Sequence, residues 1–146
     1  MVNLLKFAEN LSELMEKQGL NAPMLAKTLR TDRSNITRYL RGERLPQYGG
    51  FVAMIEYFNC SADVLLGRLD YAEEVVFLPV LPFGERLRTV MSETKTTQYR
   101  LEKDLKISGG SVYRWLFDQA LPSVESLEKL AEYMDVRIDY LLGRIQ

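Results

Sequence analysis

The stretch DRSNITRYLRGERLP, residues 32–46, returns in a weaker form as SGGSVYRWLFDQALP at residues 108–122. The same offset of 76 residues holds without a gap from Phe7 to Arg68 of the first copy. Self-similarity at a fixed offset is the signature of an internal repeat. The chain is therefore expected to contain two tandem copies of one structural unit.

The segment between the two copies, LDYAEEVVFLPVLP, differs from both in composition. Its two prolines and its β-branched valines resist helix formation. A chain of 146 residues has room for two small domains. We therefore expect a first domain at residues 1–68, an extended linker at 69–82 and a second, diverged domain at 83–146. Because VVFLPVL is apolar, the linker is expected to pack along one or both domains, or else to pair with a partner chain.

Apolar residues in each copy follow helical spacing, and no alternating run is long enough for a strand. The predicted fold class is all-α, with two tandem five-helix domains. The helices are expected at residues 3–18, 22–29, 33–41, 48–58 and 62–66, and at 83–94, 98–105, 109–117, 124–134 and 138–142. Residues suited to capping helix N-termini precede several of these helices: Asn21, Asp32, Ser61, Thr97, Ser108 and Ser123. Gly67 and Gly143 are expected to end the fifth helix of each domain.

The predicted helix at residues 33–41 has a buried face and an outward face. Ile36, Tyr39 and Leu40 share one side by the i, i+3, i+4 rule. The outward side and first turn carry Arg33, Ser34, Thr37, Arg38 and Arg41. Such a helix suits the major groove of DNA, because arginine can bond guanine O6 and N7 together and hydroxyls can reach base edges or phosphates. The alternative is an ordinary solvated helix face.

Residues 20–46, LNAPMLAKTLRTDRSNITRYLRGERLP, resemble the second and third helices and the following loop of the Cro and phage-repressor (Xre-type) helix-turn-helix family. The matching positions are Leu25, Ala26, Ser34, Ile36, Arg38, Arg41, Gly42, Arg44 and Pro46. The endings DVLLGR and DYLLGR are similar to that family's fifth helix. The resemblance implies lambda-repressor-like domains in a sequence-specific transcriptional regulator, usually a repressor. It also implies that the third helix reads the major groove while helix-two and loop residues hold phosphates.

The chain departs from this family's pattern at two points. Arg30 and Lys106 stand where family members often have glycine in the turn after helix two, and a left-handed residue there would cost about 1 kcal/mol. The phosphate-binding glutamine that often opens helix two is kept as Gln98 in the second copy. In the first copy Ala22 replaces it, so this phosphate donor is missing there.

The two copies differ in charge over the helix-turn-helix segment. Residues 20–45 carry six basic and two acidic residues, a net charge of +4. The aligned residues 96–121 carry four basic and three acidic residues, a net charge of +1. Because phosphate neutralisation supplies most sequence-independent affinity for DNA, the first copy is the expected reader of sequence.

The outward face of the third helix changes in the same direction. The second copy has Gly109, Gly110, Tyr113 and Phe117 where the first has Arg33, Ser34, Thr37 and Arg41. Phe117 could fold back against its own loop, form a protein contact with Tyr113, or accompany a Tyr113–phosphate bond. The candidate DNA-binding residues are Lys27, Arg33, Ser34, Thr37, Arg38, Arg41 and Arg44 in the first copy, and Gln98, Ser111, Tyr113 and Arg114 in the second.

Composition argues against several other classes of protein. The chain has no histidine and one cysteine, Cys60, so the usual nitrogen ligands for zinc, an internal disulfide and the commonest general base are missing. We expect no enzymatic activity, no metal and no cofactor. No apolar run approaches the roughly 20 residues that cross a bilayer, and the N-terminus does not resemble a signal peptide. A cytoplasmic location without a membrane partner is therefore expected.

The expected partner is double-stranded DNA, which the two linked domains could contact at two half-sites. A homodimer through the second domain or the linker is a further expectation. The alternative function is a protein-interaction or antitoxin-like module on the helix-turn-helix scaffold, with the second domain as the dimerisation or partner surface.

Overall fold

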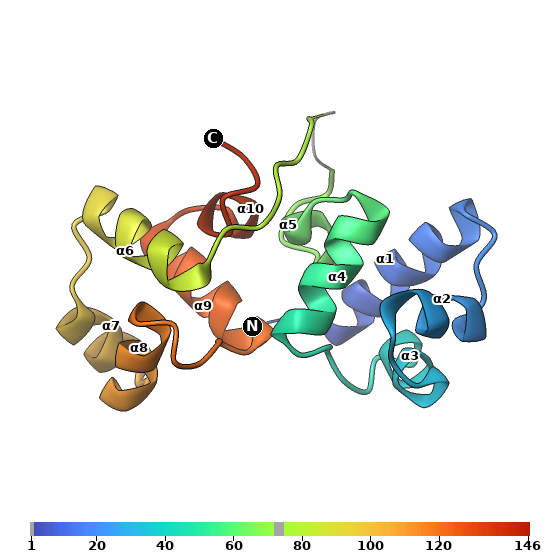
Figure 1. The fold of residues 1–146 in the computed structure, drawn as a ribbon, viewed down its shortest axis with the longest axis horizontal. Helices are drawn as coiled ribbons and strands as arrows, with labels where there is room; N and C mark the ends of the chain where they lie inside the picture. Colours follow the sequence, from blue (N-terminus) through green and yellow to red (C-terminus); the bar gives the residue numbers. More distant parts are fainter. Residues whose placement is uncertain (1, 72–74) are drawn as a thin grey trace. The chain divides into compact units, whose positions relative to one another are not determined.

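The computed structural model describes residues 2–71 and 75–146. Within these ranges it contains ten helices and no strand, which confirms the predicted all-α class (Figure 1). The chain divides into two compact units. We call Val2–Val75 the N-terminal unit and Val76–Gln146 the C-terminal unit.

Each unit contains five helices among its described residues. The N-terminal unit has α1 (Leu4–Lys17), α2 (Ala22–Leu29), α3 (Arg33–Leu40), α4 (Tyr48–Phe58) and α5 (Ala62–Leu65). The C-terminal unit has α6 (Phe83–Glu93), α7 (Gln98–Leu105), α8 (Gly109–Leu116), α9 (Val124–Met134) and α10 (Ile138–Leu141). All ten bounds agree with the sequence prediction to within one residue. Each of α7 to α10 begins and ends 76 residues after its counterpart among α2 to α5.

Five of the six predicted helix caps are present. The side chain of Asn21 accepts a hydrogen bond from the Met24 N–H at 2.9 Å. Side chains at four other helix starts accept first-turn N–H groups in the same way: Ser61, Thr97, Ser108 and Ser123. Asp32 stands at the start of α3 but makes no side-chain cap bond, which differs from the prediction. Its carboxylate can still favour the helix N-terminus through the helix dipole.

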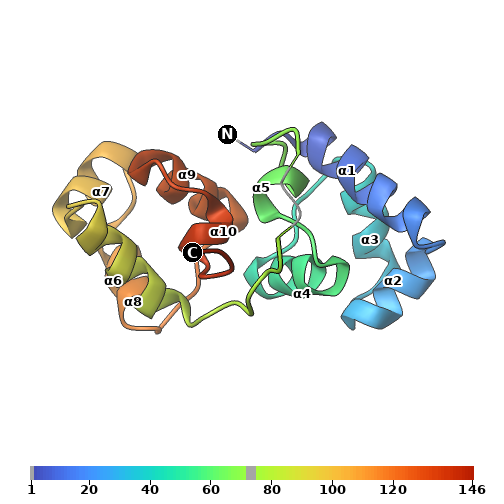
Figure 2. The same cartoon turned by 90° about the horizontal axis from the view of Figure 1, so that it is seen from above.

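The core of the N-terminal unit fixes which face of α3 points outward. Ile36 is fully buried and Tyr39 nearly so, while Leu40 is half-buried. They pack toward a core that includes Phe7 and Leu25, and the Phe7 and Tyr39 rings meet edge to face with centroids 6.2 Å apart. Figures 1 and 2 show α2 and α3 side by side, with α1 across them. The opposite side of α3 therefore faces away from the core.

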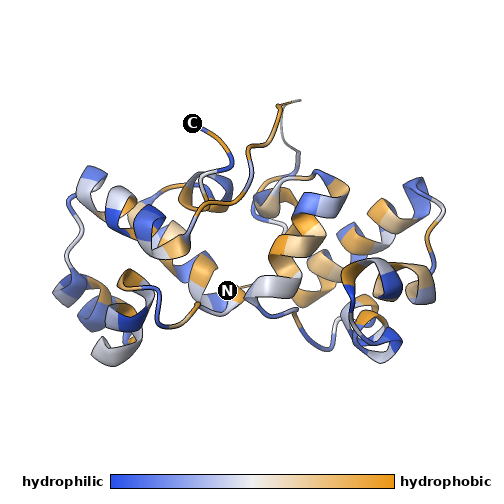
Figure 3. Ribbon diagram, viewed as in Figure 1, coloured by the Kyte–Doolittle hydropathy of each residue, from blue (hydrophilic) through white to orange (hydrophobic). Residues whose placement is uncertain are grey.

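The hydropathy of the helices agrees with this packing. Figure 3 shows α4 mostly hydrophobic through its middle, and its buried residues are Phe51, Met54, Ile55 and Phe58. The helix acts as a central core element of its unit. By contrast, the mean hydropathy of α3 is low because only one of its faces is apolar.

The turn after helix two is left-handed in both units. Arg30 has φ 55° and Lys106 has φ 54°, so non-glycine residues occupy a conformation that costs each about 1 kcal/mol. In the N-terminal unit the turn closes with a 2.9 Å hydrogen bond from the Thr31 N–H to the Ala26 carbonyl. The tight turn keeps α2 and α3 in contact.

Each unit ends with an aspartate–arginine pair. Arg68 Nε lies 3.0 Å from Asp63 Oδ1, and Arg144 Nη1 lies 2.6 Å from Asp139 Oδ1. Both aspartates are buried; the Arg68 side chain is 23% exposed and the Arg144 side chain 1%. Between the paired residues the chain turns at Gly67 and at Gly143, which have positive φ, as predicted.

The expected linker is not helical in its described residues, 69–71 and 75–82. Its later part packs on the C-terminal unit. The Leu78 N–H donates to the Arg144 carbonyl at 2.8 Å, and the Leu81 N–H donates to the Leu142 carbonyl at 3.1 Å. The Phe77 ring centroid lies 4.3 Å from the Arg144 guanidinium carbon, and the ring helps to bury this arginine. The middle of the linker, residues 72–74, lies outside the described residues.

Candidate nucleic-acid interface

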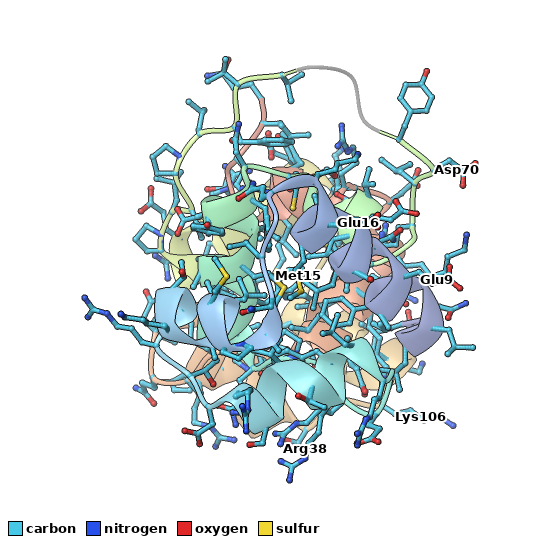
Figure 4. The ribbon with its side chains drawn as sticks, turned by 90° about the vertical axis from the view of Figure 1, so that its right-hand side faces the viewer. Glu9, Met15, Glu16, Arg38, Asp70 and Lys106 are labelled. Atoms are coloured by element: carbon cyan, nitrogen blue, oxygen red, sulfur yellow. The ribbon has the colours of Figure 1, made fainter. Side chains whose placement is uncertain are left out.

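The outward side of α3 carries most of the predicted contacts of the N-terminal unit. Arg33, Ser34 and Arg38 are exposed, and Thr37 is half-buried beside them. Arg41, the residue that ends the helix, is also exposed. Figure 4 shows Arg38 extending from α3 on the side opposite to the core residue Met15. We call these five residues the α3 surface.

Two further predicted residues extend this positive region. Lys27 on α2 and Arg44 in the loop after α3 are both exposed. The only acidic residue within 4 Å of Arg41 among the described residues is Glu43, at 3.9 Å, and both side chains are more than half exposed. Such a solvated pair is worth little, so Arg41 can exchange it for a phosphate or a base. The structure thus places all seven predicted residues of the first copy on α2, α3 and the adjoining loop.

Hydrogen bonding within α3 leaves part of its polar surface for a ligand. Thr37 Oγ1 donates to the Arg33 carbonyl at 3.1 Å, which uses its hydrogen. Its lone pairs can still accept a hydrogen bond. Beneath this surface, burial raises the pKa of Tyr39, although the Arg44 charge acts in the opposite direction. Tyr39 therefore stays neutral and adds no negative charge below the arginines.

The start of α2 offers little to a phosphate in this unit. Ala22 has no polar side chain, Pro23 has no N–H, and the Met24 N–H is already bonded to Asn21. Helix N-termini bind anions through such N–H groups. The exposed cationic side chains of the α3 surface, Lys27 and Arg44 therefore suit a phosphate better than this helix start does.

The corresponding region of the C-terminal unit is arranged differently. Gln98 Nε2 donates to Glu102 Oε1 at 2.8 Å, so the predicted phosphate donor is held by a carboxylate of its own helix. A Cβ atom on Gly109 would lie 3.0 Å from Glu102 Cδ. The acidic side chain thus occupies the space beside the first residue of α8 and opposes an approaching phosphate. Sequence reasoning counted Glu102 as a charge but did not place it there.

Ser111 and Arg114 have different environments on α8. Ser111 is half-buried, and its hydroxyl lies 3.0 Å from the Ser108 hydroxyl, which also accepts the Ser111 N–H. Ser111 is therefore part of the helix cap. Arg114 is exposed and occupies the position that Arg38 has in α3.

Tyr113 and Phe117 form an exposed aromatic pair. Their ring centroids are 4.7 Å apart and their planes are inclined by 43°. Tyr113 is 48% exposed and Phe117 55%. Phe117 thus packs on Tyr113 and does not bury itself against its own loop, which removes one of the three alternatives considered for it. We call these two residues the aromatic pair.

The family comparison bears on the C-terminal unit. Residues 87–141 match the protein-family model described as helix-turn-helix. The matched segment runs from within α6 to the end of α10, so this part of the chain is similar to helix-turn-helix domains. No curated protein and no solved structure matched the chain.

The described residues show neither a membrane-spanning helix nor a cluster of metal ligands. No helix in the described part of the chain has the length and apolar character of a bilayer span. Over the same residues, no three or more His, Cys, Asp or Glu side chains are grouped as metal ligands would be.

Proposed function

We propose that the protein is a sequence-specific DNA-binding transcriptional repressor whose N-terminal unit reads the major groove with α3. The observation that carries this proposal is the outward display of Arg33 and Arg38 on a short helix whose other face is fixed by Ile36 and Tyr39. An arginine held in this way can donate two hydrogen bonds to a guanine edge. Lys27, Arg41 and Arg44 supply phosphate contacts around it.

We also infer that the two units are copies of one domain. Asn10 in α1 and Arg86 in α6 stand at aligned positions and cap the aligned helix ends. Asn10 Nδ2 donates to the Val64 and Leu65 carbonyls at 2.8 and 3.1 Å. Arg86 donates to the aligned pair, Nη2 to the Tyr140 carbonyl at 2.6 Å and Nε to the Leu141 carbonyl at 3.4 Å. Both units thus cap the aligned helix end from the same position, although with different side chains. This shared arrangement supports the inference that the units are copies of one domain.

The test of DNA reading compares Arg38→Ala with Arg114→Ala. Selection of DNA sequences by the purified protein first supplies a cognate site, and it also reports the number and spacing of half-sites. Loss of a base contact should cost about 1–3 kcal/mol for that site. Arg38→Ala is expected to show this loss and Arg114→Ala to show little. Equal binding by the double variant Arg33→Ala/Arg38→Ala and the unaltered protein would contradict the assignment of α3.

Salt dependence separates this function from a protein-interaction or antitoxin-like module. Each phosphate contact adds about 0.9 to the negative slope of log K against log salt on duplex DNA. Lys27→Ala and Arg44→Ala should each reduce the slope by about 1. Lys129→Ala, on the exposed side of α9, is the matched control and should leave the slope unchanged. Absence of DNA binding at about 50 mM salt would favour the interaction module.

For the C-terminal unit we propose self-association through the aromatic pair. Exposed aromatic residues are enriched at protein interfaces, and Glu102 disfavours DNA on the same side of this unit. The variant Tyr113→Thr/Phe117→Arg gives the unit the residues of the first copy and should convert a dimer into a monomer. Sedimentation velocity measures the change. A protein that sediments as a monomer before and after the substitution would contradict the proposal.

A further inference from the structure

Arg88 in α6 makes a contact within the C-terminal unit that none of the described residues makes in the N-terminal unit. Its Nη1 donates to the Leu116 carbonyl, at the last residue of α8. The C-terminal end of a helix carries a partial negative charge, which a cation stabilises. An arginine from α6 thus caps the C-terminal end of α8, the helix that corresponds to α3.

The residue aligned with Arg88 in the N-terminal unit is Ser12, whose side chain is too short for this contact. Among the described residues, no side chain donates to the Leu40 carbonyl at the end of α3. An open groove of about 380 Å³ lies here instead. It is lined along α1 by Leu5, Ala8, Glu9, Ser12 and Glu13 and on the other side by Leu40 and Arg41.

The chemistry of the groove matches a guanidinium group on an aliphatic stem. Ala8 is buried and Leu40 half-buried, so they provide an apolar floor. Glu9 and Glu13 are exposed at its edge, and Figure 4 shows Glu9 on the outer side of α1. Arg41 is the one cation among the lining residues, and it lies near Glu43. The negative charge of two carboxylates and of a helix C-terminus therefore exceeds the positive charge of Arg41 in this groove.

We propose that this groove binds an arginine side chain presented by a peptide segment of a partner protein. Arginine fits better than lysine because its planar fork can bond a helix carbonyl and a carboxylate together while its stem covers apolar surface. In the C-terminal unit Arg88 supplies this hydrogen bond to the helix-end carbonyl. In the N-terminal unit the arginine of a partner would supply it. The proposal does not depend on whether α3 reads DNA.

The test uses the full ¹⁵N-labelled protein and the capped tripeptide acetyl-Ala-Arg-Ala-amide. Saturable shifts are expected in the amide signals of Ala8, Leu40 and Arg41. The citrulline tripeptide has nearly the same shape without the charge and should bind at least tenfold more weakly. The lysine tripeptide should also bind more weakly. Absence of saturable shifts with the arginine peptide, or equal binding of the citrulline peptide, would overturn the proposal.

The most informative variant replaces Ser12 with arginine, the residue at the aligned position 88 of the C-terminal unit. Ser12→Arg should place a guanidinium group in the groove, as Arg88 does, and abolish peptide binding without lowering the thermal midpoint. Ser12→Ala is the matched control and should bind as the unaltered protein does. If Ser12→Arg does not fold, Glu9→Gln/Glu13→Gln replaces it and should weaken binding at least fivefold. Binding that survives in the folded variant argues against this groove as the site.

Discussion

The Asp118 carboxylate accepts a hydrogen bond of 3.0 Å from the Gly84 N–H, which joins the loop after α8 to the first turn of α6. Helix α6 follows Pro82, which provides no side-chain cap. Asp118 therefore supplies from a distant segment the acceptor that a local cap residue supplies at other helices. It does so in the left-handed conformation, with φ 56°, at the position that Gly42 occupies in the N-terminal unit.

Gly84→Ala should destabilise the C-terminal unit by about 1–3 kcal/mol, since an added methyl group in a close-packed site forces a shift. Its Cβ would lie 2.8 Å from the Trp115 carbonyl oxygen, a backbone atom that cannot move freely. Urea denaturation followed by fluorescence measures the effect, because Trp115 is buried and is the chain's one tryptophan. Gly49→Ala in α4, where no neighbouring atom lies within 4 Å of the added Cβ, should not destabilise the N-terminal unit, which hydrogen exchange of the α4 amides follows. Equal effects of the two substitutions would contradict the close approach of α6 and α8.

Arg144→Met should cost about 3 kcal/mol, because it leaves the buried Asp139 with only part of its charge compensation. Arg137, whose Nη2 lies 3.3 Å from Asp139 Oδ2, limits the loss. Arg68→Met should cost about 1 kcal/mol or less, because Arg68 is partly exposed and solvent replaces more of its interaction. Trp115 fluorescence follows the first variant in urea, and hydrogen exchange of the α4 amides follows the second. A larger effect for Arg68 would mean that burial does not set the strength of these pairs.

Stability of the N-terminal unit should fall at alkaline pH partly through Tyr39. Burial raises the pKa of its hydroxyl above the ordinary 10.0, against the opposing charge of Arg44. Above pH 10 the unfolded state releases this proton first, so the contribution is complete below that pH and is lost as pH rises through the raised pKa. Tyr39→Phe should remove this part of the pH dependence. The unaltered protein should also show one more tyrosinate absorbance step above the ordinary range, and identical titration curves would refute the prediction.

Glu102→Ala/Gly109→Arg should increase the affinity of the protein for DNA. The two changes introduce the residue types found at the aligned positions Ala26 and Arg33 of the N-terminal unit. They raise the net charge of this face by two. At about 50 mM salt we expect a severalfold gain, with a steeper salt slope. Gly109→Arg alone should gain less, because its Cβ meets the Glu102 carboxylate. Fluorescence anisotropy with labelled duplex DNA measures both variants, and an unchanged affinity for the double variant would show that this face does not meet DNA.

The helices were predictable from the sequence because their determinants are local. Apolar spacing placed Ile36 and Tyr39 on the buried side of α3, and Asn21 and Ser108 stand at helix starts where their side chains cap the next turn. The outward direction of Arg38 followed from the same spacing. These features depend on residues three or four positions apart, whose geometry a helix fixes.

The pairing of side chains from different helices could not be predicted in this way. Glu102 lies on α7 and Gly109 on α8. Only the way these two helices cross shows that the Glu102 side chain fills the space next to Gly109. The stacking of Phe117 on Tyr113 depends on a choice of side-chain rotamers after the helix ends. The open groove beside Ser12 likewise exists only because α1 packs against the end of α3.

The sequence by itself determined an all-helical chain, the bounds of its helices and the outward position of the α3 arginines, because backbone propensity and the period of a helix act over a few residues. The tertiary structure alone decided which polar groups meet across helices: Gln98 held by Glu102, Gly84 capped by Asp118, and the end of α8 capped by Arg88. These contacts depend on where separate helices cross, and that position is set by the packing of the whole core of each unit.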